Sequence, residues 1–450
     1  MLLSQAVSSL RQRRFAKNVA VLSGGTIVGQ AIAVLASPII TRLYSPSEYG
    51  VLGVYMSALA LASVAAMLRY EVAIPVGETN REAANVCGLS MLLAVVTSVL
   101  SGVAVLLLGR SLFRSFASES VTAMAWLLPL GMLASAVYQC LSFWAVRKQD
   151  YRSLAHTKLT QSAGMVVAQI VLGGFGGGAV GLMIGHMIGR AGGVGMLARQ
   201  VMKNDRAHIA EIDRDGMRAA AVKYRQFPQF SLPAAFLDTA IANLPILLIA
   251  NLFGIQVAGW FTLVQRVLFV PAGLLTASVS QVYLGEIAEV KRSRPEALPG
   301  IFLRRCKQMA MVGAALTVVV VLAVVQLVPF VFGEKWKNAA VCGAILSPLL
   351  LASVVASPFG CTLDVLRRQD MHLARDVIRA LLMIAGVMLM YILHTSWQVG
   401  MMFLSGTGTL GYIIYWYLSW RAIRTFSGRA GESTDAGNLA AATTASQTAS

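Results

Sequence analysis

The chain has 450 residues, of which 57% are hydrophobic and only 13% are charged, and its mean hydropathy is +0.68. Soluble domains have about a quarter of their residues charged, so this composition excludes a soluble globular protein and indicates an integral membrane protein. The net charge of +17 would suggest a nucleic-acid partner in a soluble chain. In a membrane protein, basic cytoplasmic loops account for such an excess, so no nucleic-acid partner is predicted.

The first 16 residues contain several arginines, and we expect them to form a short amphipathic helix on the cytoplasmic surface. The apolar run that follows continues into a second apolar segment, which favours an uncleaved first span over a signal peptide. A span needs about 20 apolar residues, and the chain offers about twelve such segments, so we predict an all-α polytopic membrane protein. The predicted spans are residues 18–43, 50–76, 83–109, 120–145, 155–174, 178–198, 228–252, 256–284, 302–332, 339–363, 372–394 and 397–420.

The loop charges predict the orientation of these spans. With a cytoplasmic N-terminus, most of the 37 Lys and Arg residues fall in cytoplasmic segments, as the positive-inside rule requires. Both termini are then cytoplasmic and the outside loops are short. The longest loops, 199–227 and 285–301, are mixed in charge and are expected to form surface helices. We predict an N-lobe over 17–200, a cytoplasmic linker over 201–227, a C-lobe over 228–425 and a disordered cytoplasmic tail over 426–450.

The two predicted lobes repeat in sequence. ITRLYSPSEYG at 40–50 aligns without gaps on IANLFGIQVAG at 249–259, and LLASVV at 350–355 matches MLASAV at 132–137. Each repeat holds an even number of spans, so both lobes point the same way through the membrane. Parallel repeats of this kind are one architecture of alternating-access transporters, with the substrate between the lobes.

The sixth predicted span has glycines at every fourth position. A helix face without side chains allows close packing of another helix, and a sliding surface between helices is the alternative interpretation. These glycines are Gly177, Gly181, Gly185, Gly189 and Gly193.

Charges inside spans are costly and are candidates for function. Arg266 lies about twelve residues beyond Gly254, or roughly 18 Å deep, where either a water-filled anion-binding cavity or a structural ion pair would stabilise it. Gln265 beside it adds a hydrogen-bonding group, which suits either a polar substrate path or ordinary hydrogen bonding between helices. Asp238 lies at a similar depth, and it either neutralises Arg266 or takes up H⁺ or Na⁺.

Arg69 and Glu71 lie near the cytoplasmic end of the second predicted span. Two residues on a helix are about 200° apart, so we expect them to face opposite sides and not to pair with each other. Arg69 is a candidate for anion binding or for contact with lipid headgroups, and Glu71 for ion coupling or a structural pair. Arg42, at the outer end of the first span, lies either at the cavity mouth or among headgroups.

The remaining polar residues give weaker signals. His186 and Arg190, four residues apart, form either a small polar cluster or ordinary packed polar contacts near a helix end. The five cysteines and five histidines show no spacing that is typical of a metal site. No metal and no cofactor are predicted.

Two stretches resemble a known family. ITRLYSPSEYGVLGVYMSALALASVAAMLRYEVAIP at 40–75 and GWFTLVQRVLFVPAGLLTASVSQVYLGEIAE at 259–289 are similar to the Wzx-type oligosaccharide flippases of bacterial inner membranes. The resemblance implies the multidrug/oligosaccharidyl-lipid/polysaccharide exporter fold, with two six-helix lobes around a central cationic cavity. It also implies a polyprenyl-diphosphate-linked oligosaccharide as cargo, membrane lipids as partners, and the polymerase and chain-length proteins of the same pathway.

Other function classes agree less well with the sequence. A membrane glycosyltransferase or polymerase usually needs a large outside loop, which this chain lacks. A drug/cation antiporter of the same superfamily would favour acidic over basic cavity residues. A peptidoglycan-precursor flippase differs only in its cargo. The sequence therefore predicts a transporter and not an enzyme.

Overall fold

The computed structural model describes residues 21–113 and 126–448, and the predicted amphipathic segment 1–16 lies outside them. Over these two ranges the secondary structure is helical, without strands, which confirms the predicted all-α class. Nine helical stretches in the described ranges are long and apolar enough to cross a membrane. These are Val21–Leu43, Pro46–Ala65, Asn80–Leu108, Leu127–Arg147, Gly178–Asn204, Phe227–Phe253, Ile255–Ser293, Pro295–Leu322 and Ser347–Val365.

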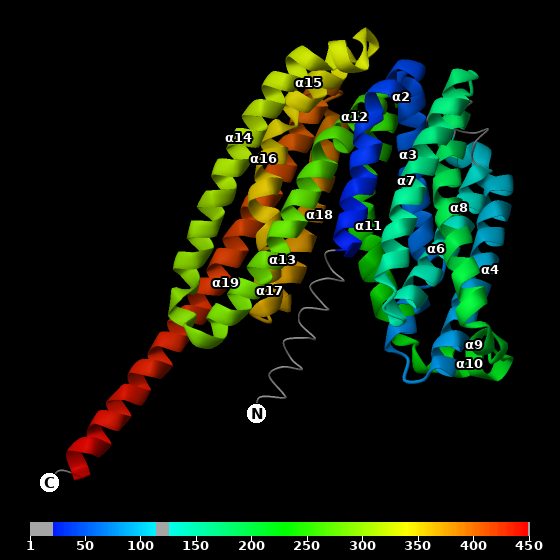
Figure 1. Ribbon diagram of the computed structural model, residues 1–450. Helices are drawn as coiled ribbons and strands as arrows, with labels where there is room; N and C mark the ends of the chain where they lie inside the picture. The colour runs from blue at the N-terminus through cyan, green and yellow to red at the C-terminus, as the bar shows by residue number, and fades with distance from the viewer. Residues whose placement is uncertain (1–20, 114–125, 449–450) are drawn as a thin grey trace. The chain divides into compact units, whose positions relative to one another are not determined.

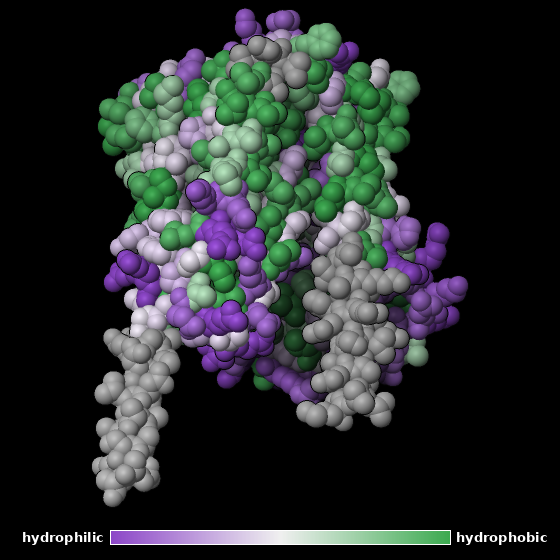
Figure 2. Space-filling view, turned by 60° about the vertical axis from the view of Figure 1, so that its left-hand side comes forward, coloured by the Kyte–Doolittle hydropathy of each residue, from purple (hydrophilic) through white to green (hydrophobic). Residues whose placement is uncertain are grey.

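The other three predicted spans are also helices, although their composition alone does not mark them as spans. They are α7 (Tyr151–Gly174), α18 (Gln369–Ile392) and the first part of α19 (Trp397–Thr448). Many large apolar side chains of α4 and α18 are exposed, as lipid-facing helices require. Figure 2 shows a broad hydrophobic surface on the visible face, with hydrophilic residues gathered towards its lower end.

The helices divide into two compact units, and the N-terminal unit contains Met1–Leu263 with Pro329–Lys337. Within this unit the long helices run side by side, and α9 and α10 lie at one end (Figure 1). We refer to that end as the predicted cytoplasmic end. Its elements are α2 (Ser37–Leu43), α3 (Pro46–Ala65), η1 (Tyr70–Val76), α4 (Asn80–Phe113), α6 (Leu127–Arg147), α7, α8 (Gly178–Asn204), α9 (Arg206–Ala210), α10 (Arg214–Lys223), η3 (Phe227–Ser231), α11 (Leu232–Phe253), most of α12 (Ile255–Val264) and η6 (Glu334–Trp336).

The C-terminal unit contains Val264–Val328 and Asn338–Ser450. Inside it, Arg305 on α14 makes a two-pronged ion pair with Glu286 on α13, with N–O distances of 2.8 and 2.9 Å. Its elements are η4 (Gln265–Phe269), α13 (Val270–Ser293), η5 (Pro295–Ala297), most of α14 (Leu298–Phe332), α15 (Lys337–Ile345), α16 (Ser347–Ala356), η7 (Ser357–Phe359), α17 (Cys361–Val365), α18 and α19.

Capping residues explain where several helices begin. Ser45 accepts a hydrogen bond from the Glu48 amide, and Glu48 accepts one from the Ser45 amide, which is a complete capping box before α3. Pro46 occupies the first helical position, where its missing N–H costs nothing. Asp150 and Asp213 cap α7 and α10 in the same way through their carboxylates.

Three sequence predictions differ from the structure. The second predicted span does not stay helical to residue 76, because α3 ends at Ala65. Residues 285–301 form no separate surface helix, since α13 continues to Ser293 through residues that favour helices. The tail predicted to be disordered is drawn as the last part of α19, which ends at Thr448. Alanine has the highest helix propensity, and the polar composition of the tail gives no information on its backbone.

Candidate functional site

The second predicted span is broken close to its predicted cytoplasmic end. After Ala65 the chain makes a short turn in which Leu68 and Arg69 have left-handed backbones, with φ of 50° and 67°. A 3₁₀ helix, η1, then runs over Tyr70–Val76 and contains Pro75. Broken helices at membrane depth are tolerated where protein or water satisfies the freed backbone groups, and in transporters they often form ion or substrate sites.

Side chains from neighbouring helices satisfy the freed carbonyls of this break. Thr97 on α4 donates its hydroxyl to the Ala66 carbonyl at 2.7 Å. Arg147, the last residue of α6, donates from Nη1 to the carbonyls of Ile74 at 3.2 Å and Gly77 at 2.7 Å. The role of Arg147 was missed in the sequence, where it reads as one of many basic loop residues.

The break brings Arg69 and Glu71 together. The Arg69 guanidinium lies 3.6 Å from the Glu71 carboxylate, so the prediction that the two residues cannot pair was wrong. The helical period on which it rested does not apply to a left-handed turn followed by a 3₁₀ helix. Glu71 is only 2% exposed, and within the described residues neither its Oε2 nor Arg69 Nε has a hydrogen-bond partner.

The surroundings of Glu71 are formed by α4, α6 and the segment after α8. The free thiols of Cys87 on α4 and Cys140 on α6 lie 3.1 Å apart. On the other side of η1, the Tyr70 hydroxyl donates to the carbonyl of Ala221 on α10 at 3.1 Å. The buried carboxylate therefore lies in a polar, tightly held break.

Arg42 lies far from this break. It precedes α3 whereas Arg69 follows it, and the 20 residues of α3 span about 30 Å. The exposed Arg42 side chain donates to the Phe330 carbonyl at 3.3 Å, and the Arg42 carbonyl accepts from Lys335 at 3.3 Å. Arg42 is therefore hydrogen-bonded to residues 329–337 and lies apart from Arg69.

Gln265 and Arg266 lie on a short π-helical turn, η4, within the first half of the long helical stretch Ile255–Ser293. Both residues are half-buried. A π turn widens a helix by one residue and is frequent at functional sites. Asp238, in contrast, lies in the first half of α11 with an exposed side chain.

The glycine stripe of α8 faces neighbouring helices. A Cβ at Gly185 would come within 3.0 Å of the Gln169 amide nitrogen on α7, and one at Gly189 would lie 2.7 Å from the Gln161 carbonyl. A Cβ at Gly181 would lie 3.1 Å from Leu172, which is also on α7. A side chain at Gly185 or Gly189 would force neighbouring atoms to move, and one at Gly181 would make a tight contact, so this face of α8 favours glycine.

No group of three or more His, Cys, Asp and Glu side chains within residues 21–113 and 126–448 is arranged to hold a metal ion. The break and η4 carry charged and hydrogen-bonding side chains, which are Arg69 and Glu71 at the break and Gln265 and Arg266 on η4. Buried or half-buried Arg side chains can bind an anion through two parallel N–H bonds. The buried Glu71 carboxylate can bind a proton or a small cation.

A family model described as "Polysaccharide biosynthesis protein" matches residues 39–341, which is more than half of the chain. The chain is also similar to the teichuronic acid biosynthesis protein TuaB of Bacillus subtilis, with 25% identity over 201 residues. That alignment covers 43% of this chain and 41% of the relative, so it spans less than half the length of the relative.

Two solved transporter structures are similar to the whole chain. The first is a multidrug resistance MATE family transporter of the MOP superfamily in its inward-facing conformation, with a TM-score of 0.72 and 16% identity. The match covers 91% of this chain and 99% of that one. The second is the lipid II flippase MurJ in an inward closed conformation, with a TM-score of 0.64, 12% identity and coverage of 88% and 86%. At these identities the likeness shows the fold alone.

Proposed function

We propose that this chain, which belongs to the polysaccharide biosynthesis protein family, translocates polyprenyl-diphosphate-linked oligosaccharides across the bacterial inner membrane. The family match agrees with the resemblance to Wzx-type flippases, and the similarity in fold to solved transporters supports a transporter in place of an enzyme. The chain is a multi-pass membrane protein. The cargo, the direction from the cytoplasmic to the periplasmic leaflet and the alternating-access mechanism are parts of the proposal.

The observation that carries the proposal is the half-buried Arg266 on a π turn inside the apolar helical stretch Ile255–Ser293. A basic residue inside a membrane-spanning segment is a candidate for function. The diphosphate of a lipid-linked oligosaccharide supplies an anion for this residue, and the planar guanidinium matches its oxygens. Gln265 beside Arg266 provides hydrogen bonds to sugar hydroxyls.

Arg69 and Arg42 take the other parts of the pathway in this proposal. Arg69, which keeps 25% of its side chain exposed, meets the diphosphate near the predicted cytoplasmic end. Arg42 lies towards the opposite end of α3 and attracts the anionic cargo as it leaves. The polyprenyl tail stays in the bilayer throughout, so that only the charged and sugar parts need a polar path.

Glu71 and Asp238 are the proposed sites of coupling to an H⁺ or Na⁺ gradient. Glu71 is favoured by its burial and its partly unsatisfied carboxylate. A proton or cation that binds one conformation better than the other shifts the balance between them by that difference in affinity. No other cofactor enters the proposal.

The orientation follows the loop charges, with both termini in the cytoplasm. The proposed partners are membrane lipids and the polymerase and chain-length proteins that would receive the cargo. The similarity to a teichuronic acid biosynthesis protein favours a surface polysaccharide as the final product. The likeness to a lipid II flippase keeps a peptidoglycan precursor as the second candidate cargo.

The deciding experiment measures the lipid-linked oligosaccharide pool in host cells with and without this protein, separated by leaflet. Complete repeat units that accumulate on the cytoplasmic side of the deletion strain support the proposal, and the accumulated sugar identifies the cargo. Accumulated lipid II would select the peptidoglycan alternative. An unchanged pool would contradict the proposal and would make a drug or cation substrate the next hypothesis to test.

A further inference from the structure

Two free thiols from different helices lie in contact near the break in the N-terminal unit. The sulfurs of Cys87 on α4 and Cys140 on α6 are 3.1 Å apart, and the Cys140 thiol also lies 3.8 Å from the Cys87 carbonyl oxygen. The sulfurs of a disulfide are about 2.05 Å apart. A further approach of only about 1 Å would therefore allow these two sulfurs to form a covalent bond.

The two cysteines lie at the same level of neighbouring helices. Cys87 follows Asn80, the first residue of α4, by seven positions, and Cys140 precedes Arg147, the last residue of α6, by seven. Seven helical residues span about 10 Å, so each thiol lies about 10 Å inside the predicted cytoplasmic end of its helix. The Arg147 guanidinium donates to the Asn80 side chain at 3.3 Å, which fixes the two helix ends beside each other.

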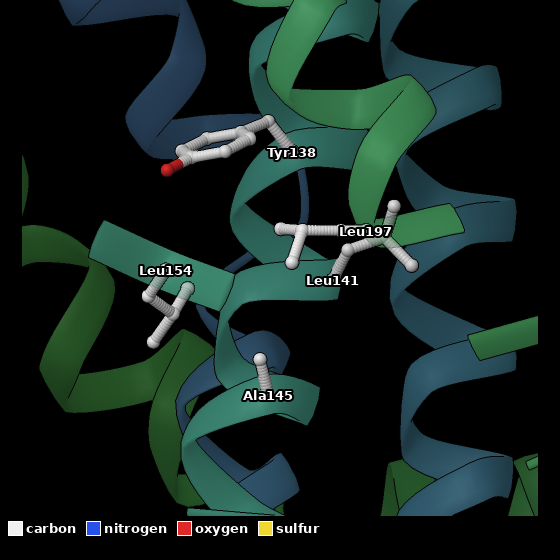
Figure 3. Close-up of a cluster of buried hydrophobic side chains, with 5 residues drawn as sticks. All are labelled: Tyr138, Leu141, Ala145, Leu154 and Leu197. Atoms are coloured by element: carbon white, nitrogen blue, oxygen red, sulfur yellow. The ribbon is translucent and has the colours of Figure 1, made fainter. Parts of the chain in front are cut away.

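The packing of α6 keeps Cys140 directed towards α4. One face of α6 belongs to a hydrophobic cluster with α7 and α8. Figure 3 shows the five central residues of this cluster, which are Tyr138, Leu141, Ala145, Leu154 and Leu197. Cys140 lies outside that face, about 100° from Leu141 and about 200° from Tyr138 around the helix. The cluster fixes the rotation of α6 about its axis and thereby the position of the Cys140 thiol.

Cys87 is the more accessible residue of the pair. It is half-buried, whereas Cys140 is fully buried. The next residue, Gly88, faces Ile212 and Met217 at the predicted cytoplasmic end, since a Cβ at Gly88 would lie 2.7 and 3.3 Å from their side chains. A small reagent that enters from this end therefore reaches the Cys87 sulfur first.

The other three cysteines have no second thiol in contact with them within the residues that the structure describes. The Trp416 indole donates to the Cys306 sulfur at 3.3 Å, and the Cys361 thiol donates to the Pro358 carbonyl at 3.8 Å. Cys342 is fully buried. All five thiols are free, so these three cysteines serve as internal controls for the pair.

We propose that Cys87 and Cys140 form a redox site, in which a peroxide converts the two thiols into a disulfide. The Cys87 sulfur attacks one peroxide oxygen, the O–O bond breaks, and the leaving hydroxide takes the thiol proton as water, which gives a sulfenic acid. The Cys140 sulfur then attacks the Cys87 sulfur, the S–O bond breaks, and a second water leaves. The two thiols lose two protons and two electrons, and the peroxide is reduced to water. Thiol–disulfide exchange with a cytoplasmic dithiol reverses the modification.

The disulfide would join the two helices that hold the break. η1 packs against both α4 and α6. Thr97 on α4 donates to the Ala66 carbonyl, and Arg147 on α6 donates to the Gly77 carbonyl. A bond between α4 and α6 therefore stabilises the break. Because Glu71 in this break is a proposed coupling site, the oxidised protein should move cargo more slowly, and this last step rests on the proposed function.

The first test maps the thiols of the unmodified full-length protein in nanodiscs of phosphatidylcholine. The protein is reduced, freed of reductant, treated with hydrogen peroxide, denatured in excess maleimide and digested for mass spectrometry. We expect a linked pair of peptides that contain Cys87 and Cys140, and dithiothreitol should separate them. The other three cysteines should remain labelled with maleimide. Full labelling of Cys87 and Cys140 after peroxide treatment, or an equal loss of label at all five cysteines, would overturn the inference.

Two matched variants test the order of the steps. Cys87→Ser should leave Cys140 fully labelled after peroxide treatment, because no sulfenic acid forms beside it. Cys361→Ser, a substitution of another half-buried cysteine, should form the link between Cys87 and Cys140 to the same extent as the unmodified protein. Oxidation should slow hydrogen exchange of residues 70–76 by about tenfold or more in Cys361→Ser and leave it unchanged in Cys87→Ser. Equal oxidation of Cys140 with and without Cys87 would contradict the proposed pair.

Measurements of cargo movement distinguish this inference from the proposed function. Peroxide should slow cargo movement by the unmodified protein and by Cys361→Ser, dithiothreitol should restore it, and Cys87→Ser should be insensitive. If deletion of the protein traps cargo but no disulfide forms, only this inference is wrong. If deletion leaves the cargo pool unchanged, the proposed function is wrong, and the linked peptides still decide whether the redox site exists.

Discussion

Gly50 on α3 and Gly259 on α12 face each other where the two helices cross, and neither position leaves room for a side chain. A Cβ at Gly50 would overlap with the carbonyl oxygen of Ile255, and a Cβ at Gly259 would overlap with that of Pro46. Each clashing residue precedes the opposite glycine by four positions. The contact is therefore symmetric, because each helix presents the same pair of positions to the other.

This symmetry matches the internal repeat of the sequence. Pro46 and Gly50 align with Ile255 and Gly259 in the gapless alignment of 40–50 on 249–259. A local two-fold axis thus passes through the crossing, as in the self-complementary interface of a symmetric dimer. A repeat that was visible in the sequence has therefore become a direct contact between its two copies.

Gly50→Ala and Gly259→Ala should each destabilise the protein, because the new methyl group meets backbone atoms that cannot move aside. Overpacking of this kind costs about 1–3 kcal/mol. Thermal unfolding of the purified variants in detergent measures the effect. The control is Gly164→Ala on α7, where a Cβ would meet nothing within 4 Å and where alanine favours the helix. Unfolding temperatures unchanged in both variants would show that the helices separate readily at this crossing.

The sequence predicts the helical class and most of the spans, because hydrophobic length reports directly on membrane solvation. It does not predict the break after Ala65, since apolar residues continue on both sides of Arg69 and Glu71 as far as Val76. Hydropathy gives no information about backbone conformation. Pro75 and the two charges were the available signals, and together they could have suggested an irregular helix end.

The sequence likewise predicts some features of the candidate site and misses others. Counting residues from Gly254 predicts that Arg266 lies deep in a span, and the structure places Arg266 inside the helical stretch Ile255–Ser293. The π turn that carries Arg266 depends on packing and has no sequence signature. The pairing of Arg69 with Glu71 was predicted wrongly because a regular helix was assumed.

Arg266→Ala should reduce cargo movement by more than about tenfold, because a hydrogen bond to a charged group contributes about 1.5–3 kcal/mol. Arg266→Lys should retain part of the activity, since lysine supplies the charge without the planar fork. Leaflet-separated cargo pools in cells measure both variants. Arg304→Ala, an exposed position on α14, serves as control. A correctly inserted Arg266→Ala protein with normal transport would remove Arg266 from the site.

Glu71→Gln should make cargo movement insensitive to collapse of the proton gradient, because glutamine keeps the shape of the side chain but cannot titrate. The measurement compares cargo movement with and without a protonophore. Glu78→Gln is the control, since Glu78 is exposed and pairs with Lys223 at the surface. If Glu71→Gln keeps the normal response to the protonophore, Asp238 becomes the remaining candidate, and Asp238→Asn is then tested in the same way.

Asp213 controls how firmly α10 is held against α4. A hydrogen bond of 2.7 Å from Arg81 holds the pKa of the Asp213 carboxyl below its ordinary value, with help from the Gly216 amide. A pKa that is lower in the folded state contributes stability above the unfolded value of about 3.9. This contribution is lost as the pH falls through the folded value, so α10 should loosen below about pH 4.

Hydrogen exchange over residues 206–226, corrected for the intrinsic effect of pH, measures this loosening. Asp213→Asn should exchange at pH 7 at the rate that the unmodified protein shows only in acid, because asparagine keeps the cap but loses the charge. The control is Asp215→Asn, because Asp215 lies two residues after Asp213 and is exposed. This variant should exchange at the normal rate. Since Tyr70 donates to Ala221 at the end of the same helix, a loosened α10 should also raise exchange in η1. Protection of η1 that stays unchanged in Asp213→Asn would show that the break holds Glu71 without the support of α10.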